Sequence, residues 1–311
     1  MTQRFSTAQI VFTKLTKVAQ VSFTAAIAFH LWVTPSLAGD PFGRNAAHQI
    51  GDHTEAAFKA IFQQGNYPEA ERHLKEALAK EPNEPLAYAM QASLAYSKGD
   101  FTGLDKYSQQ ILDAGQKLVA NDPLRGNLYT AVGHFFEGAV IVTREGAAKG
   151  ATQALGRLRQ VYEYLDKAEA ISPKDPELNL LRGYMDLMLS VNLPFANPDE
   201  AIGRLETSAA PRYLADRGIA IGYRDLKQYT QALDYANQAI QGAPDNPELY
   251  YLKAQILKEK GRREKSQELL RDAIANFDRA LTKKSQLPAS LVKQIERERN
   301  SAVNQLNNSS R

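Results

Sequence analysis

The stretch Gly65-Asn66-Tyr67-Pro68-Glu69-Ala70 decides the fold, because its opening triplet recurs 34 residues later as Gly99-Asp100-Phe101. Glycine adopts the left-handed backbone conformation cheaply, so each Gly-Asn or Gly-Asp pair predicts the end of a helix. Ala70 and Ala77, seven residues apart, lie on one face of the helix that follows, and Pro82 stops that helix. The stretch therefore predicts a helical hairpin that repeats with a period of about 34 residues.

The same spacing returns in the second half of the chain. Ala232, Ala239 and Pro244 repeat the pattern of the first hairpin. The run Asp175-Pro176-Glu177-Leu178 corresponds to Asn246-Pro247-Glu248-Leu249, 71 residues later, which is roughly two periods. No such unit can bury its apolar face alone, so the units must stack on one another.

These features resemble the tetratricopeptide repeat (TPR) family over most of residues 51–282. The resemblance implies an all-α, right-handed superhelical solenoid of TPR-like helical hairpins with one concave groove. We expect about six units: 51–84, 85–122, 123–175, 176–211, 212–246 and 247–282. The third unit is irregular, since its long first helix, Pro123 to about Thr143, is followed by an interrupting segment from Arg144 to Gly150. The fourth has a longer turn, Ser190 to Pro198.

The two ends of the chain differ from the repeats. Arg4, Lys14 and Lys17 precede an apolar stretch, 18–33, and small residues end at Ala38. This order predicts a signal peptide over 1–38, with an uncleaved anchor as the alternative. The polar, Pro- and Gly-containing segment 39–50 is interpreted as a linker. Residues 287–306 carry one apolar stripe and predict a helix that caps the last repeat, and 307–311 are expected to fray.

Composition narrows the classes of function. The chain has 311 residues, 43% of them hydrophobic and 23% charged, and no cysteine, so disulfides and thiol chemistry are excluded. Its 38 basic and 35 acidic residues become 35 of each once 1–38 is removed, which argues against nucleic-acid binding. Residues 251–311 alone carry net charge +7, which is compatible with a solvated surface or with weak docking to an acidic partner or anionic head groups.

Catalytic and metal-binding motifs are weak in this sequence. Gly146 to Gly150 lacks the spacing of a phosphate-binding loop and is interpreted as a connection between helices. His48, Asp52 and His53 form the nearest approach to a metal cluster, but Gly51 indicates a helix start and Asp52 suits a helix N-terminus, so we predict no metal site and no cofactor. His134 and Glu137, three residues apart, predict a half-buried histidine that bonds a carboxylate.

The resemblance also implies where a partner would bind. Positions of the first helix of each TPR hairpin line the concave groove, and the residues at matching positions here combine aromatic and polar types. Tyr88, Tyr223 and Tyr250 fall at family core positions instead. Some family members clamp a peptide carboxylate with lysine and asparagine, but Glu55 and Lys59 in the first unit and Met90 in the second stand at those places, so we do not predict that specificity. The predicted protein-binding groove comprises Glu55, Lys59, Phe62, Ser93, Tyr96, Tyr184, Arg217, Arg224, Tyr251, Gln255 and Lys258.

We therefore expect a non-catalytic, exported scaffold or adaptor that binds a protein or peptide segment in its groove, in envelope or membrane-complex assembly. The signal and the repeats together look bacterial, which predicts the periplasm, or the thylakoid lumen in a cyanobacterium. One alternative is a membrane-anchored structural component that uses 18–33 and the basic C-terminal unit for peripheral membrane contact. Another is an enzyme with a site around His134, Glu137, Arg144 and Glu145. Self-association into a homo-oligomer stays open.

Overall fold

The computed structural model describes residues 39–44, 47–190 and 198–309, within one compact unit that begins at Gly39. The segment 1–38, predicted as a signal or anchor, and most of the predicted long turn of the fourth repeat lie outside these residues. The described part is helical and contains no strand. None of its helices combines the length and the apolar character needed to cross a bilayer.

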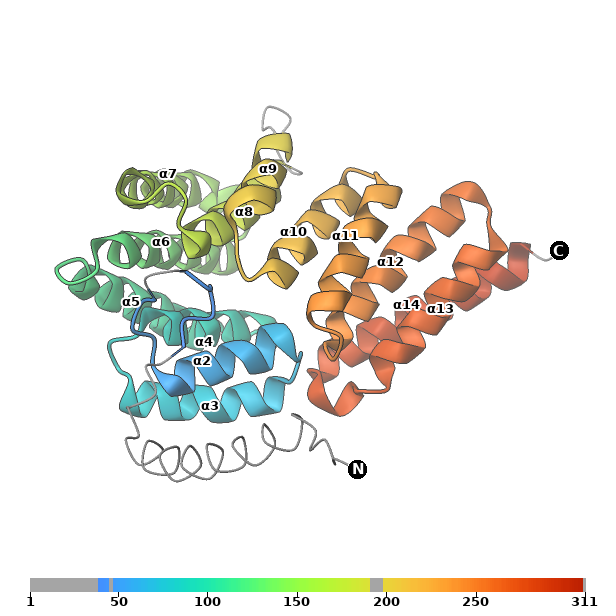
Figure 1. Cartoon of the computed structure of the whole chain (residues 1–311), viewed down its shortest axis with the longest axis horizontal. Coiled ribbons are helices and arrows are strands. Elements are labelled where there is room, and N and C mark those ends of the chain that lie inside the picture. Colours follow the sequence, from blue (N-terminus) through green and yellow to red (C-terminus); the bar gives the residue numbers. More distant parts are fainter. Residues whose placement is uncertain (1–38, 45–46, 191–197, 310–311) are drawn as a thin grey trace, which may run out of the picture. The chain divides into compact units, whose positions relative to one another are not determined.

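The helices pack in consecutive pairs (Figure 1). The six pairs are α2 (Asp52–Phe58), extended by the π-helix η1 (Lys59–Gln63), with α3 (Tyr67–Lys80); α4 (Pro85–Lys98) with α5 (Phe101–Leu118); α6 (Pro123–Glu145) with α7 (Ala147–Ile171); α8 (Pro176–Ser190) with α9 (Pro198–Ser208); α10 (Arg212–Asp225) with α11 (Tyr229–Gly242); and α12 (Pro247–Glu264) with α13 (Gln267–Leu281). A short 3-10 turn, η2 (Lys284–Gln286), leads to α14 (Ala289–Ser309). This is an all-α helical repeat solenoid.

Local sequence explains where the helices begin and end. The side chain of Asp100 accepts a hydrogen bond from the Gly103 amide at 2.8 Å and so caps α5, and Asn246 caps α12 in the same way at Glu248. Gly65 and Gly99 have φ of 62° and 71° between the helices of the first two hairpins. The fifth and sixth hairpins have lysines there, Lys227 and Lys265, with φ of 61° and 54°. The predicted turns are thus left-handed, with or without glycine.

Small residues form the contacts between paired helices. Ala70, Ala77, Ala232 and Ala239 are fully buried. A side chain at Gly183 would place its Cβ 2.6 Å from Leu205, so α8 and α9 approach closely only because glycine stands there. The alanine and glycine periodicity therefore reports helix packing within each hairpin.

Three predicted boundaries differ from the structure. Within the predicted linker 39–50, residues 39–44 and 47–50 are not helical but are not a free linker either, because Phe42 and Ile50 are buried against the helices. The expected interruption at 144–150 shrinks to Gly146, since α6 reaches Glu145 and α7 begins at Ala147. At the C-terminus, Asn307 to Ser309 belong to α14 rather than to a frayed tail.

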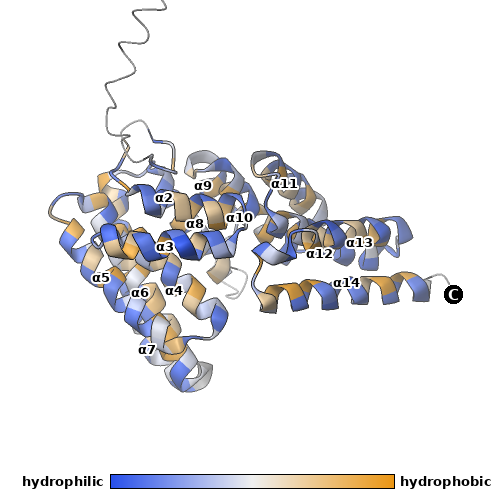
Figure 2. Cartoon of the chain, turned by 90° about the horizontal axis from the view of Figure 1, so that it is seen from below, coloured by the Kyte–Doolittle hydropathy of each residue, from blue (hydrophilic) through white to orange (hydrophobic). Residues whose placement is uncertain are grey.

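Helix α14 covers the last hairpin, mainly through α13. Hydrophobic and hydrophilic residues alternate along it (Figure 2). Ile295 and Ala302 of its apolar side are fully buried in a cluster with Phe277 and Leu257. The amphipathic stripe read from the sequence therefore packs on the sixth hairpin.

Candidate binding cavity

The first helices of the first five hairpins line one apolar cavity of about 520 Å³. Because these helices occupy equivalent places in successive hairpins, their equivalent faces meet at one hollow. Almost every lining side chain is aromatic or aliphatic, and Arg217 is the one charged residue among them. The lining residues are Phe42, Phe58, Phe62, Leu86, Ala89, Met90, Ser93, Tyr129, Val132, Phe135, Phe136, Leu180, Leu181, Tyr184, Met185, Met188, Leu214, Arg217 and Ile221.

Aromatic residues from three segments pack at one side of this cavity. Phe42, which precedes the helices, meets Phe58 of α2 edge-on with ring centroids 5.2 Å apart. Phe58 in turn contacts Phe62 at 4.8 Å. The π-helix η1 carries Phe62, and such a wide turn rotates the residues after it relative to a regular α-helix. Burial against these rings gives the cavity a rigid aromatic wall.

Arg217 lies where the first and sixth hairpins touch. Its Nη2 donates a 2.8 Å hydrogen bond to Glu248, whose other carboxylate oxygen accepts one of 2.9 Å from the Tyr67 hydroxyl. Beside this pair, the Asn246 amide donates to the carbonyl of Phe62 at 2.9 Å. We call these five residues the end-to-end contact, because it joins segments about 180 residues apart in the chain.

The environment of the end-to-end contact shifts two pKa values. Burial would lower the pKa of Arg217, but the nearby Glu248 carboxylate outweighs it and raises that pKa further above its usual range. Burial, followed by the same carboxylate, raises the pKa of the Tyr67 hydroxyl. Both groups therefore keep their protons throughout the physiological range, and Arg217 presents a permanent positive charge at the cavity.

The structure brings four of the eleven predicted groove residues to the cavity: Phe62, Ser93, Tyr184 and Arg217. Tyr184 is held there by a 2.7 Å hydrogen bond from its hydroxyl to the Leu214 carbonyl, and burial raises its pKa to about 12. Tyr96 lies one helical turn beyond Ser93 on α4 and is 55% exposed. Glu55 and Lys59 form an ion pair one turn before Phe62, and Glu55 also accepts a hydrogen bond from the Gly39 amide.

The C-terminal members of the predicted groove do not line the cavity. Tyr251 was expected to face the groove, but it is only 8% exposed and donates a 2.6 Å hydrogen bond to Glu298 of α14. Gln255 bonds the same tyrosine and the same carboxylate, and it accepts a hydrogen bond from Arg224. Lys258, further along α12, is half-buried. Helix α14 thus covers the part of α12 that the family pattern assigns to ligand.

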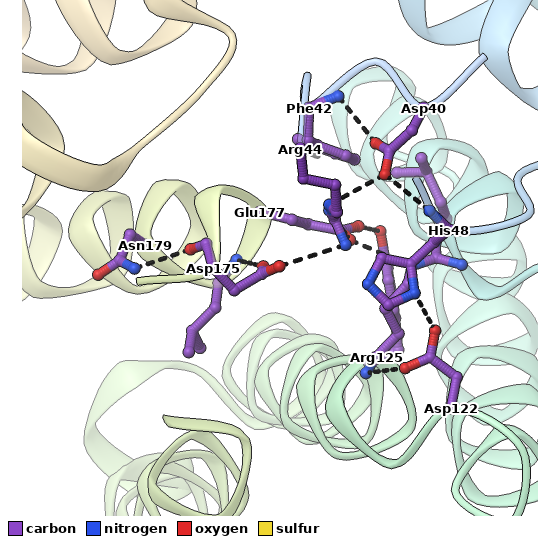
Figure 3. A network of polar contacts seen from close by, with 12 residues as sticks. Asp40, Phe42, Arg44, His48, Asp122, Arg125, Asp175, Glu177 and Asn179 are labelled. Carbon is purple, nitrogen blue, oxygen red and sulfur yellow. Dashed lines mark hydrogen bonds and ion pairs between the residues drawn. The ribbon is translucent and has the colours of Figure 1, made fainter. Parts of the chain in front are cut away.

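A buried polar network, absent from the sequence predictions, holds residues 39–44 to the helices (Figure 3). Arg125 of α6 is 1% exposed and donates to Glu84 at 2.8 Å and to Glu177 at 3.1 Å. Arg44 donates to the same Glu177 at 2.8 Å and lies 2.9 Å from Asp40. The network therefore joins the segment before α2, whose described residues 39–44 and 47–50 we call the strap, to three different hairpins.

Opposing effects set the pKa values of this network. Burial would raise the pKa of Glu177, but Arg125, Arg44 and the Tyr129 hydroxyl together lower it. Hydrogen bonds from His48 and from the Arg125 amide likewise outweigh burial and lower the pKa of Asp122. For Asp175, burial wins and raises the pKa. The fold thus favours the ionised form at Glu177 and Asp122 and disfavours it at Asp175.

The three residues that came nearest to a metal cluster in the sequence do not lie together in the structure. His48 pairs with Asp122, whereas the His53 ring lies 3.5 Å from Lys80 and Asp52 is exposed at the start of α2. Among the described residues, no group of three or more His, Cys, Asp or Glu side chains is placed to hold a metal ion.

In the third hairpin, His134 is buried and lies 2.9 Å from Glu137, which confirms the predicted histidine–carboxylate bond. Arg144 instead pairs with Asp105, and Glu145 is exposed. The four residues named for an enzymatic site are therefore not brought together at one point.

Successive helical hairpins that share apolar faces define a helical-repeat protein. Residues 56–103 and 223–285 each match a family model described as tetratricopeptide repeat. These two stretches therefore contain tetratricopeptide repeats.

Several solved structures are similar to this chain. A thermophilic TPR protein of Thermus thermophilus is 19% identical, with 81% of this chain and 97% of that chain covered and a TM-score of 0.31. The human IFIT1 dimer with PPP-AAAA is 15% identical, with 82% and 71% covered and a TM-score of 0.40. The TPR2AB domain of yeast Sti1 in complex with pHSP90 is 18% identical, with 82% and 97% covered and a TM-score of 0.32. The search of curated proteins gave no match.

Proposed function

We propose that this TPR protein is an exported scaffold that binds a segment of a protein partner across the mouth of its apolar cavity. The TPR fold supports a protein-interaction role in general. The segment 1–38, with its basic start, apolar stretch and small residues before Gly39, supports export to a periplasm or a thylakoid lumen. In that compartment the scaffold would serve the assembly of envelope or membrane complexes.

The observation that carries the proposal is a pair of exposed apolar side chains beside the cavity. Tyr96 is 55% exposed one turn beyond Ser93, and Met188, a lining residue, is 44% exposed. Large exposed aromatic and methionine side chains beside an apolar hollow are typical of protein-binding surfaces, where they act as anchors. Lys59 lies exposed one turn before Phe62 and adds a polar, charged border. We call Lys59, Tyr96 and Met188 the rim.

Site-specific crosslinking tests the binding surface. The full chain, with a photoreactive phenylalanine analogue at position 96, would be expressed in its native cells and irradiated. We expect a discrete crosslinked partner from position 96 and none from position 101, because Phe101 is 46% exposed but begins α5, a second helix of a hairpin. Equal crosslinking from both positions, or none from position 96, would contradict the proposed surface.

The proposed export has its own test. Cell fractionation should place the protein outside the cytoplasm, and its N-terminal sequence should begin at Gly39 if a peptidase cuts after Ala38. A protein that keeps Met1 and stays with the membrane would favour the anchored alternative. Recovery of the full chain in the cytoplasm would contradict export.

A further inference from the structure

The cavity offers few hydrogen-bonding groups to a ligand. The Ser93 hydroxyl donates to the Ala89 carbonyl, Tyr129 to Glu177, and Tyr184 to the Leu214 carbonyl. The one lining side chain with donors left over is Arg217, since only its Nη2 makes a hydrogen bond within the described residues. An extended peptide brings one N–H and one C=O with each residue, and most of these would be buried here without partners.

The volume of the cavity also limits its occupant. At about 520 Å³ it falls in the range of small-molecule sites, about 300–1,000 Å³. An α-helix has a diameter of about 10–12 Å and rises about 5.4 Å per turn, so a single turn would occupy most of that space. The cavity is therefore suited to a narrow chain without amide groups, rather than to a protein segment in either regular conformation.

Arg217 adds a requirement at one end of such a ligand. Arg217 lines the cavity, so filling it removes water from the guanidinium, and any donor left without an acceptor weakens binding. A carboxylate oxygen would accept a charge-assisted hydrogen bond from either of the remaining donors, Nε or Nη1, which point to different sides of the guanidinium. Glu248 stays on Nη2 and, with Tyr67, fixes the orientation of the guanidinium.

From these constraints we infer that the cavity binds a long unbranched alkyl chain that ends in a carboxylate, a fatty acid, with the carboxylate on Arg217 and the chain among the aromatic and methionine side chains. This inference goes beyond the protein-binding role, which concerns the rim. The isolated protein should bind the fatty acid without a protein partner.

Calorimetric titration of the full chain, after removal of co-purified lipid, tests the inference with palmitate as the probe. Hexadecanol, which has the same chain and no charge, and octanoate, which has the same head and half the length, serve as comparison ligands. We expect saturable binding of one palmitate per chain, with hexadecanol and octanoate each at least tenfold weaker. Hexadecanol as tight as palmitate, octanoate as tight as palmitate, or no saturable binding would overturn the inference.

Two variants separate the site from a general affinity for lipid. Ala89→Leu with Ser93→Leu fills the cavity and should abolish binding, whereas Ala79→Leu, at an exposed position on α3, should leave it unchanged. Arg217→Met paired with Glu248→Gln removes both charges together, so that no unpaired carboxylate remains. It should weaken palmitate about tenfold and leave hexadecanol unaltered. Unchanged palmitate binding in the Ala89→Leu/Ser93→Leu variant or in the Arg217→Met/Glu248→Gln variant would contradict the assignment, and circular dichroism confirms that each variant is folded.

The result of the palmitate titration can be told apart from the result of the crosslinking test of the proposed function. Loss of crosslinking from position 96 would not affect palmitate binding, and failure of palmitate binding would leave the rim intact. Vesicles that contain phosphatidic acid but no free fatty acid provide a last arm. Stoichiometric uptake of that lipid in preference to palmitate would overturn the carboxylate assignment in favour of a phosphate head group.

Discussion

Arg125 Nε lies 3.1 Å from Glu177 Oε2, although 52 residues separate the two and both side chains are fully buried. The same guanidinium reaches Glu84 at 2.8 Å. One arginine therefore fixes the second, third and fourth hairpins against one another. A buried ion pair of this kind contributes little over an apolar pair, but removal of one partner leaves charge stranded in the interior.

Replacement Arg125→Met should destabilise the protein by about 3–5 kcal/mol, because Glu84 and Glu177 would lose their shared counter-ion while staying buried. Urea unfolding followed by circular dichroism measures this. The matched change Arg144→Met breaks a pair with Asp105 in which the arginine side chain is 57% exposed, and it should change the unfolding free energy by less than about 1 kcal/mol. Similar losses from both would contradict the role given to Arg125.

Acid should weaken the network through Glu177. Folding lowers the pKa of this carboxyl, so its stabilising contribution is present above its ordinary pKa of 4.5 and is lost as the pH falls through the folded-state value. The stability difference between wild type and Glu177→Gln should therefore be large at pH 7 and shrink below about pH 4.5. Urea titrations at a series of pH values measure it. A difference that stays constant down to pH 3 would show that ionisation of Glu177 is not involved.

Removal of the Phe42 ring should release the strap. Phe42 is 2% exposed and packs on Phe58, so Phe42→Ala should lose about 3–5 kcal/mol of stability, or less where the strap detaches instead of leaving a hole. Detachment would expose the Arg44 side chain, which is 7% exposed in the folded protein, to trypsin. Limited proteolysis should then cut the variant there faster than wild type or Phe101→Ala, whose ring is exposed. Equal cutting rates would argue that Arg44 and Asp40 hold the strap alone.

Two glycines in the third hairpin should respond in opposite directions to alanine. A Cβ at Gly126 would lie 2.5 Å from the backbone nitrogen of Val119, so Gly126→Ala should destabilise by about 1–3 kcal/mol. Gly156 is exposed on α7 with nothing within 4 Å of the same position, so Gly156→Ala should stabilise by up to about 1 kcal/mol. Thermal unfolding distinguishes the two variants. A loss of stability in Gly156→Ala would indicate that α7 is not helical at that position.

The left-handed lysines offer a stabilising change. Non-glycine residues cost about 1–2 kcal/mol in this conformation, so Lys265→Gly, at φ 54°, should raise the unfolding free energy by about 1 kcal/mol. Lys253→Gly, inside α12, should lower it by about the same amount. If both changes destabilise, the side chain of Lys265 contributes a contact that outweighs its backbone strain.

The fold could be predicted because its determinants are local. The alanine pairs at 70 and 77 and the turn at Gly99 recur with a fixed period, and each reports the packing within its own hairpin. The position of Phe62 and Ser93 on the cavity follows from the same period, since equivalent positions of stacked hairpins face one hollow.

The rest depends on contacts between distant residues. Arg125, Glu84 and Glu177 each stand in the first turn of a helix or just before one, where charged residues are ordinary, and nothing local shows that they meet. Tyr251 follows the family pattern for a groove residue, but Glu298 and α14 cover it, and the docking of α14 is not encoded in the repeat. The sequence of residues 39–50 predicts a linker for the same reason, since Phe42 meets its partner Phe58 only in the folded protein.

The end-to-end contact has a consequence for cooperativity. In a repeat array whose units touch only their neighbours, stability is a sum of nearest-neighbour terms, and a terminal unit can unravel while the rest persists. Here Tyr67 and Glu248 join the two terminal hairpins. Neither can then open without breaking an interface that the other shares. The six hairpins should therefore unfold cooperatively, because loss of any one hairpin removes an interface on which the others depend.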